Sequence, residues 1–148
     1  MRCFEETREL AVSPERMFDI VMDIDAYPAF LPWVADARVL TRKEGELTAE
    51  LAAELGGRQF RFRTIDRFVP GKIVEIRLLE GPFNFLESVW TFEPASADAQ
   101  GCRVHFSIEF EFRSSMLDLV ASPLFATACR SMVHAFERRA LELAGEWP

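Results

Sequence analysis

The sequence has few of the groups on which disulfide scaffolds and metal centres depend. Its three cysteines, Cys3, Cys102 and Cys129, are far apart and form no C-x-x-C pair. An odd number of isolated cysteines is typical of free thiols in a reducing compartment. The two histidines are His105 and His134, and Cys102 with His105 supplies only half of a metal-ligand pattern. We therefore expect no disulfide framework, no metal site and no cofactor.

Catalytic motifs are also missing. The sequence contains no G-x-S-x-G turn, no P-loop and no H-E-x-x-H helix. Asp23 and Asp25 lack the remaining ligands of a calcium loop. His105 is predicted on the solvent face of a strand, and the facing of His134 is ambiguous. These absences favour a protein that is not an enzyme and has no catalytic residue. An acid-base cyclase with one arginine or aspartate in a pocket stays the alternative.

Basic charge and long apolar runs are scarce as well. The formal net charge is −7 and the sequence pI is about 4.9, which disfavours direct DNA binding and broad attraction to anionic lipid. No apolar run approaches the ~20 residues that cross a bilayer. The first residues, 1–6, turn acidic without the apolar segment of a signal peptide. We expect a cytoplasmic protein that meets the inner membrane only peripherally.

Phenylalanine, by contrast, is abundant. The chain has 14 Phe and 3 Trp against a single Tyr, and 49% of its residues are hydrophobic. Its 148 residues suit one domain of ordinary size, so we predict a single domain over 1–148. Because Phe buries a large apolar area and has no hydrogen-bonding group, its excess predicts a very dry core or a dry cavity lined by rings. The pattern leaves both open.

Period-2 alternation of apolar and polar residues predicts an antiparallel sheet with one dry face and one wet face. Gly56-Gly57 marks a hairpin between two such runs, and short turns elsewhere make the sheet a meander. The alternating runs lie at 4–12, 47–55, 60–63, 74–78, 86–92 and 104–112.

Helices are expected before and after these runs. Ser13 can cap a helix whose first turn contains Pro14. The prolines of Tyr27–Trp33 restrict that segment to a turn or a brief helical piece. Ser115 resembles the start of a capping box, and Ser122-Pro123 is expected to restart or kink the chain into a helix that ends near residue 144, roughly 33 Å long. Together the elements predict an α+β fold in which an antiparallel sheet of six to seven strands packs on a long C-terminal helix.

Three motifs occur in order along the chain. The first is Asp23–Trp33, with the pattern D-x-x-x-Y-P-x-F-L-P-W. The second is G-P-F at 81–83 followed by W-T-F at 90–92, and the third is F-E-F-R-S at 110–114 followed by M-V-x-A-F-E-x-R-A at 132–140. From about Phe4 to Gly145 the chain resembles the coenzyme Q-binding branch of the START-like, polyketide cyclase/dehydrase-like superfamily. The first motif is the most specific of the three.

The resemblance implies a helix-grip fold, in which a curved antiparallel sheet wraps around a long C-terminal helix and a lipid-sized cavity. It also implies binding of ubiquinone or a similar polyprenyl lipid as the bound ligand, in support of respiration. Closely similar bacterial proteins are toxins that block association of ribosomal subunits into 70S particles, so ribosome contact is the first alternative. The superfamily also includes polyketide cyclases and aromatase-like enzymes, which is the second alternative.

The candidate ligand-binding residues come from the inward positions of the strands and the last helix and from the two sides of a predicted mouth. The Tyr27–Trp33 segment is expected to form a wall or lid of that mouth, and Phe83 and Phe85, beside a turn, its opposite rim. Ordinary core packing remains the competing interpretation for each ring, above all for Phe30 and Leu31. The full set is Tyr27, Phe30, Leu31, Trp33, Phe60, Phe62, Phe83, Phe85, Trp90, Phe106, Phe110, Phe112, Phe125, Met132 and Phe136.

Three polar residues share the apolar face of their strands. Thr64 and Asp66 have the parity of Phe62, and Ser88 has the parity of Trp90. Polar groups in a cavity need hydrogen-bond partners, and these three are candidates for contacting a quinone head. We favour the plainer expectation that they lie near strand ends, where solvent reaches them.

A ribosome-binding surface is the weaker expectation. Arg61, Arg63 and Arg67 are predicted on the wet face of the sheet, together with Glu50 and Glu75. Interspersed charge of both signs is typical of a solvated surface. We therefore rank lipid binding above ribosome contact.

Overall fold

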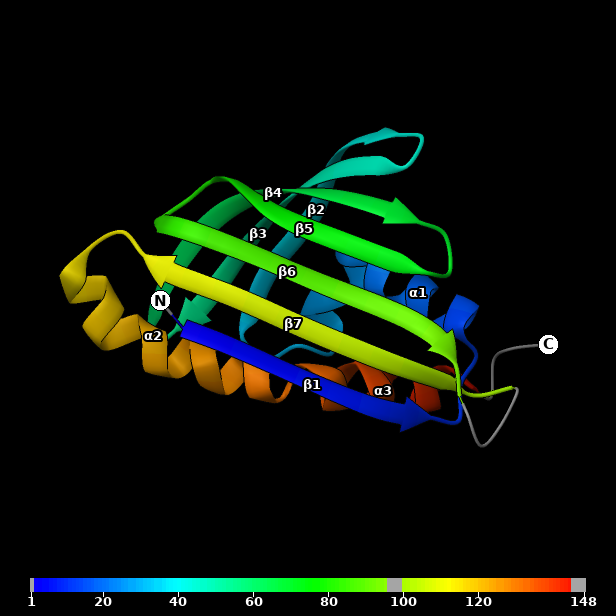
Figure 1. The fold of residues 1–148 in the computed structure, drawn as a ribbon. Coiled ribbons are helices and arrows are strands. Elements are labelled where there is room, and N and C mark those ends of the chain that lie inside the picture. Colours follow the sequence, from blue (N-terminus) through cyan, green and yellow to red (C-terminus); the bar gives the residue numbers. More distant parts are fainter. Residues whose placement is uncertain (1, 96–99, 145–148) are drawn as a thin grey trace.

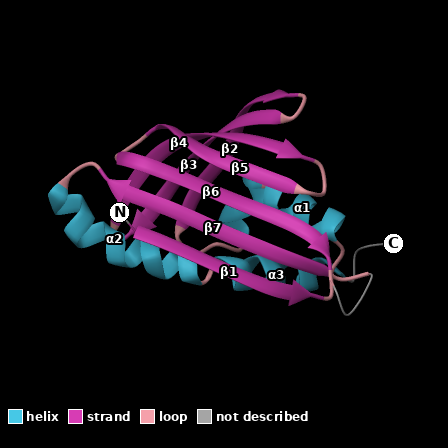
Figure 2. Cartoon of the chain, viewed as in Figure 1, coloured by secondary structure: helices cyan, strands magenta, loops and turns pink. Residues whose placement is uncertain are grey.

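The computed structural model describes residues 2–95 and 100–144, which form a curved antiparallel sheet covered on one face by helices (Figure 1, Figure 2). The predicted domain 1–148, and Gly145 at the end of the motif resemblance, reach beyond these ranges. The sheet has seven strands in the order β1-β7-β6-β5-β4-β3-β2. The strands are β1 (Arg2–Leu10), β2 (Val34–Lys43), β3 (Glu46–Leu55), β4 (Arg58–Val69), β5 (Ile73–Glu80), β6 (Phe83–Pro94) and β7 (Cys102–Phe112). The α+β fold class is confirmed.

The meander from β2 to β7 follows from the alternating runs and their turns. Every neighbouring pair of strands is antiparallel, and β1 is added at the edge of the meander by pairing with β7. Gly56 and Gly57 join β3 to β4 with φ of 61° and 81°. That left-handed region is open to glycine at no steric cost, so the predicted hairpin is confirmed.

The first helices are α1 (Pro14–Met22) and the short 3-10 helix η1 (Ile24–Ala29). Ser13 Oγ accepts a hydrogen bond from the Arg16 backbone N–H at 3.2 Å, and Pro14 lies in the first turn, as expected. Pro28 lies within η1, so the brief helical piece predicted for Tyr27–Trp33 is also present.

The prediction of one continuous C-terminal helix is wrong. The chain forms α2 (Ser115–Arg130) and α3 (Met132–Leu143), which are bent by 43° at Ser131. Ser131 Oγ donates to the Ala128 carbonyl oxygen at 2.9 Å, a side-chain hydrogen bond that competes with the helical ladder. Within the described ranges no single helix has the length and apolar composition of a membrane span, and α2 and α3 reach both only as a bent pair.

The start of α2 also differs from expectation. Ser114, not Ser115, is the N-cap, and Pro123 lies inside the helix without restarting it. The first half of α2 projects past the ends of the strands (Figure 1) and exposes Met116 and Leu119. Only the second half, with α3, covers the concave face of the sheet.

Strand β2 is missing from the sequence-based prediction. Its pairing with β3 has register shifts at Val34/Asp36 and at Val39/Thr41. Each shift inserts a residue and reverses the parity of those that follow, so apolar positions no longer alternate. The strand therefore has no period-2 signature that a pattern search can detect.

Candidate functional site

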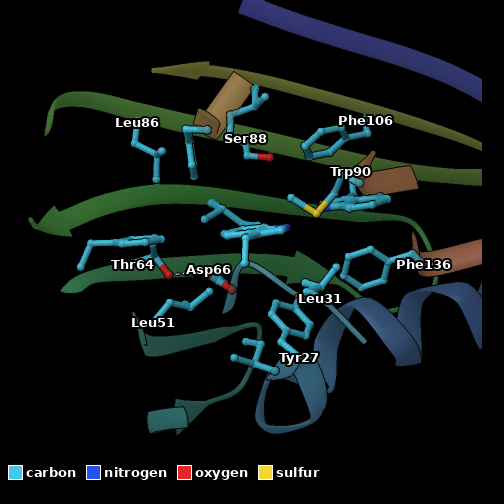
Figure 3. A pocket seen from close by; sticks show the side chains of 17 residues that line it. Tyr27, Leu31, Leu51, Thr64, Asp66, Leu86, Ser88, Trp90, Phe106 and Phe136 are labelled. Carbon is cyan, nitrogen blue, oxygen red and sulfur yellow. Dashed lines mark hydrogen bonds between the residues drawn. The ribbon is translucent and has the colours of Figure 1, made fainter. Parts of the chain in front are cut away.

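A cavity of about 80 Å³ lies between the concave face of the sheet and the helices α2, α3 and η1. Figure 3 shows side chains from both layers pointing toward one another across it. Its lining residues are Ile24, Tyr27, Leu31, Trp33, Leu51, Phe62, Thr64, Asp66, Ile76, Leu86, Ser88, Trp90, Phe106, Ile108, Phe125, Met132 and Phe136. Most of these side chains are apolar, so the cavity suits an apolar ligand.

Strand periodicity positions the sheet side of this cavity. On β6, Ser88 and Trp90 point inward because every second residue of a strand faces the same side. On β7 the same rule brings Phe106 to the wall, where its ring centroid lies 4.6 Å from that of Trp90. The inward facing predicted for these strands is confirmed by their burial.

The helical side closes the cavity with rings. Phe136 on α3 lies 5.0 Å from Trp90 and 5.4 Å from Tyr27, measured between ring centroids. Phe125 on α2 packs edge-on against Trp33 at 5.8 Å. Edge-to-face contacts of this kind fix ring orientation as well as burying area. The wall is therefore built from elements that are far apart in the sequence.

The Tyr27–Trp33 segment forms one end of the cavity. Tyr27 donates a hydrogen bond from its hydroxyl to the Val21 carbonyl oxygen, and burial raises its pKa well above the ordinary value. The carbonyl oxygen of Trp33 accepts from the Glu54 backbone N–H at 2.7 Å, which anchors the segment to β3. Among the described residues, the buried indole N–H of Trp33 has no hydrogen-bond partner.

The polar residues Thr64, Asp66 and Ser88 are buried in the cavity wall, with 2%, 4% and 5% of their surfaces exposed. The expectation that solvent reaches them near strand ends is wrong, because the helices cover the middle of β4 and β6. Thr64 Oγ1 donates to Asp66 Oδ1 at 2.8 Å, and Ser88 Oγ donates to the Ser107 carbonyl oxygen at 3.0 Å. Burial raises the pKa of Asp66 to about 7 against the opposing effect of the Thr64 hydrogen bond.

Four of the candidate rings pack beside the cavity without lining it. They form a packed cluster with Phe125, in which Phe83 and Phe112 are stacked 4.5 Å apart and Phe110 meets Phe125 at 4.7 Å. The cluster consists of Phe60, Phe83, Phe110, Phe112 and Phe125. Apart from Phe125, ordinary core packing describes their observed place, and a ligand contact for them stays a prediction.

Two further candidates lie outside the cavity. A register shift between Phe83 and Phe85 reverses the parity of β6, so Phe85 shares the outer face with Glu87 and is half-buried. Phe30 is half-buried at the outside of η1, 5.1 Å from Phe136 and under the Arg139 guanidinium. A lid role for Phe30 stays a prediction, whereas Phe85 lies on the opposite face of the sheet from the cavity.

Several lining residues had no place in the candidate set. Leu51, Ile76 and Leu86 line the cavity from β3, β5 and β6, and Ile24 lines it from η1. The three strand residues show the same inward alternation as the rings, so including aliphatic residues of that parity would have found them. Ile24 carries no such signal.

His105, Cys102 and Cys129 do not line the cavity. His105 lies on the outer face and hydrogen-bonds Thr7 at 2.6 Å, as expected for a surface histidine. Burial raises the pKa of Cys102 to about 11 and that of Cys129 to about 12, so both thiols are unreactive. In residues 2–95 and 100–144, no three His, Cys, Asp or Glu side chains group closely enough to hold a metal ion.

Three arginines of the outer face surround one carboxylate. Glu50 lies 2.7 Å from Arg38, 3.6 Å from Arg61 and 3.8 Å from Arg63. The Arg38 hydrogen bond holds the pKa of Glu50 below its ordinary value. The predicted mixture of charges on the wet face is confirmed, and these arginines are engaged with a glutamate of the same chain.

Comparisons with known proteins agree with the three motifs. A family profile described as polyketide cyclase/dehydrase and lipid transport matches residues 10–137. The Ribosome association toxin RatA of Rickettsia prowazekii is 35% identical over 97% of this chain and 99% of its own length. The mitochondrial Coenzyme Q-binding protein COQ10 homolog B of Xenopus laevis is 34% identical over 96% of this chain and 59% of its own length.

A solved structure gives the same fold. The Zhui aromatase/cyclase from Streptomyces sp. R1128 matches with a TM-score of 0.83, covering 97% of this chain and 95% of its own, at 14% identity. At that identity the likeness shows the fold alone. Curved sheet and C-terminal helices are thus shared with an enzyme, and the fold by itself does not select between binding and catalysis.

Proposed function

The chain belongs to the polyketide cyclase/dehydrase and lipid transport family, and we propose that it binds a polyprenyl quinone such as ubiquinone in its cavity and carries it without chemical change. The observation that carries this proposal is the wall of Trp90, Phe106, Phe136 and their apolar neighbours around an internal space. The similarity to the Coenzyme Q-binding protein COQ10 homolog B supports the quinone as ligand.

The size of the cavity sets a condition on this function. Pockets that hold small organic ligands usually measure roughly 300–1,000 Å³, several times the 80 Å³ present here. A quinone with an isoprenoid tail therefore enters only if the helices move away from the sheet. The bend at Ser131 and the lid position of Phe30 make α3 and η1 the elements that we expect to move.

The first test is mass spectrometry of organic extracts from protein purified without detergent, with an unrelated protein of similar size as the control. Stoichiometric ubiquinone in the extract is the expected result. In a second experiment the purified protein is titrated with decylubiquinone, and binding is followed by the quenching of tryptophan fluorescence. A quinone-free extract together with no saturable quenching would remove the carrier proposal.

Ribosome association is the second candidate function. The observation that favours it is the match to Ribosome association toxin RatA over nearly the whole of both chains. If the chain acts in this way, adding purified protein to ribosomal subunits lowers the 70S fraction in a sucrose gradient. An unchanged 70S fraction at saturating protein would exclude it. The two candidates are independent, because one concerns the interior and the other a surface.

A further inference from the structure

The cavity has a polar side and an aromatic side. Figure 3 shows Thr64 and Asp66 together on one side, and Trp90, Phe106 and Phe136 gathered on the other. Thr64 and Asp66 are almost fully buried, so no bulk solvent surrounds them. A cavity for a purely hydrocarbon ligand would gain nothing from buried polar groups, which cost stability unless a partner satisfies them.

The hydrogen bonds already made at this site leave two groups available. The Thr64 hydroxyl donates to Asp66, and the Ser88 hydroxyl donates to Ser107, so neither proton is free for a ligand. The indole N–H of Trp33 is buried and unpartnered within the described part of the chain. The carboxyl of Asp66 accepts from Thr64 and, when protonated, can donate its own O–H.

The surroundings of Asp66 raise the pH at which it loses its proton. Its neighbours across the sheet are Leu47 on β3 and Ile76 on β5, both apolar. On the facing element η1, the titratable group is Tyr27, whose own pKa is raised by burial and by the charges of Asp66 and Asp23. Among residues 2–95 and 100–144, no Lys, Arg or His lines the cavity. Without a cation to stabilise the carboxylate, burial favours the neutral acid, whose pKa is about 7.

Resting on the proposed function, we infer that the Trp33 indole N–H and the protonated Asp66 carboxyl both donate hydrogen bonds to carbonyl oxygen of the ligand. Both groups are donors, so the site matches an acceptor such as the carbonyl of a quinone or ketone. The cavity therefore selects an apolar molecule that carries a carbonyl over a hydrocarbon of similar size. Because the Asp66 donor is lost on ionisation, binding weakens as the pH rises through about 7.

The test compares two probes on one set of variants. Decylubiquinone carries the carbonyl groups, whereas decylbenzene has the same tail length on a ring without acceptors. Trp33→Phe keeps an aromatic ring and removes the N–H. Asp66→Asn keeps a donor at every pH, and Asp66→Val removes it. Thermal unfolding and decylbenzene affinity together report whether each variant keeps the fold and the apolar cavity.

We expect Trp33→Phe and Asp66→Val each to weaken decylubiquinone binding about tenfold, the effect of one lost hydrogen bond, with decylbenzene unchanged. Wild-type affinity for decylubiquinone falls between pH 6 and pH 8, and that of Asp66→Asn stays level. If Trp33→Phe and Asp66→Val bind decylubiquinone as tightly as the wild type, the inferred hydrogen bonds to the carbonyl are wrong. The proposed carrier function would then still stand. Failure of the wild type to bind either probe would overturn both.

Discussion

The cavity and the packed cluster lie next to each other on the same face of the same strands, yet only one leaves space. Phe125 belongs to both. In the packed cluster, ring meets ring at 4.5 Å, and no polar side chain is among its members. Along β4, the residues that follow Phe60 and Phe62 on the inner face are Thr64 and Asp66. The buried polar residues of this aromatic face thus coincide with the cavity and are absent from the packed cluster.

The β5–β6 turn lies unusually close to β4 at Phe62, a residue that lines the cavity. A Cβ at Gly81 would lie 2.5 Å from Phe62 Cβ, a separation that side chains do not reach. The glycine therefore lets the β5–β6 turn approach the Cα and Cβ atoms of Phe62 closely. From the helical side, Ile24 and Tyr27 of η1 line the cavity, whereas Phe30 packs outside it against Phe136.

The largest effect should come from the packed cluster. Phe110→Ala removes a ring with 1% of its surface exposed and should lower the free energy of unfolding by about 3–5 kcal/mol. Urea denaturation measures the change. Phe85→Ala, on the outer face of β6, is the matched control and should cost less than about 1.5 kcal/mol. Equal losses in the two variants would show that the cluster is not tightly packed.

The second effect concerns the polar side of the cavity. Between pH 4 and pH 7 the folded chain holds the Asp66 proton that the unfolded chain releases, so stability falls as the pH rises. Each pKa unit corresponds to about 1.4 kcal/mol, which gives a loss of about 3 kcal/mol between pH 5 and pH 8. Asp66→Asn should lack this loss.

Urea denaturation at pH 5, 6.5 and 8 measures the slope for the wild type and Asp66→Asn. Asp36→Asn, an exposed aspartate on β2, serves as the control and should keep the wild-type slope. If Asp66→Asn shows that slope too, the carboxyl does not retain its proton in the folded chain.

A third experiment fills the space directly. Leu86→Phe enlarges a residue that lines the cavity, and the added atoms enter existing space, so stability should change by less than about 1 kcal/mol. Quinone binding should be abolished. Leu47→Phe makes the same substitution at a buried position that does not line the cavity, and overpacking there should cost about 1–3 kcal/mol. Thermal unfolding with decylubiquinone titration separates the two, and retained binding in Leu86→Phe would place the ligand elsewhere.

The smallest effect is expected at the lid. Phe30→Leu keeps apolar bulk but loses the contact with the Arg139 guanidinium, which is worth about 0.5–1 kcal/mol at an exposed site. Amide hydrogen exchange at Phe30 and Leu31 should accelerate, while that at Phe110 in the packed cluster stays the same. Unchanged exchange at Phe30 and Leu31 would mean that this ring does not hold η1 closed.

The sequence predicted the arrangement of the sheet well because side-chain parity is a local property. Trp90 and Phe106 face inward as their alternation indicates. The pattern failed where the backbone changes register, at Phe85 and along β2, since a bulge reverses parity without a reliable residue signature. Ser131 is no sequence signal for the break between α2 and α3, because serine also occurs within helices.

The site could be predicted only in part, for a different reason. Whether Phe60 packs and Phe62 lines a space depends on how η1, α2 and α3 cover the sheet. No local sequence pattern encodes the placement of these helices on the sheet. Asp66 was expected in contact with solvent because it was placed near a strand end. Its parity with Phe62 indicated the inward facing that the structure has.

Strand β2 is one edge strand of the open sheet, where unpaired backbone groups can pair with a strand from another copy. Its two register shifts twist that edge away from a flat template, and Arg38, Arg42 and Lys43 add exposed charge along it. Both features disfavour strand addition and fibril growth. The irregularity that conceals β2 in the sequence thus also protects the folded chain from aggregating edge to edge.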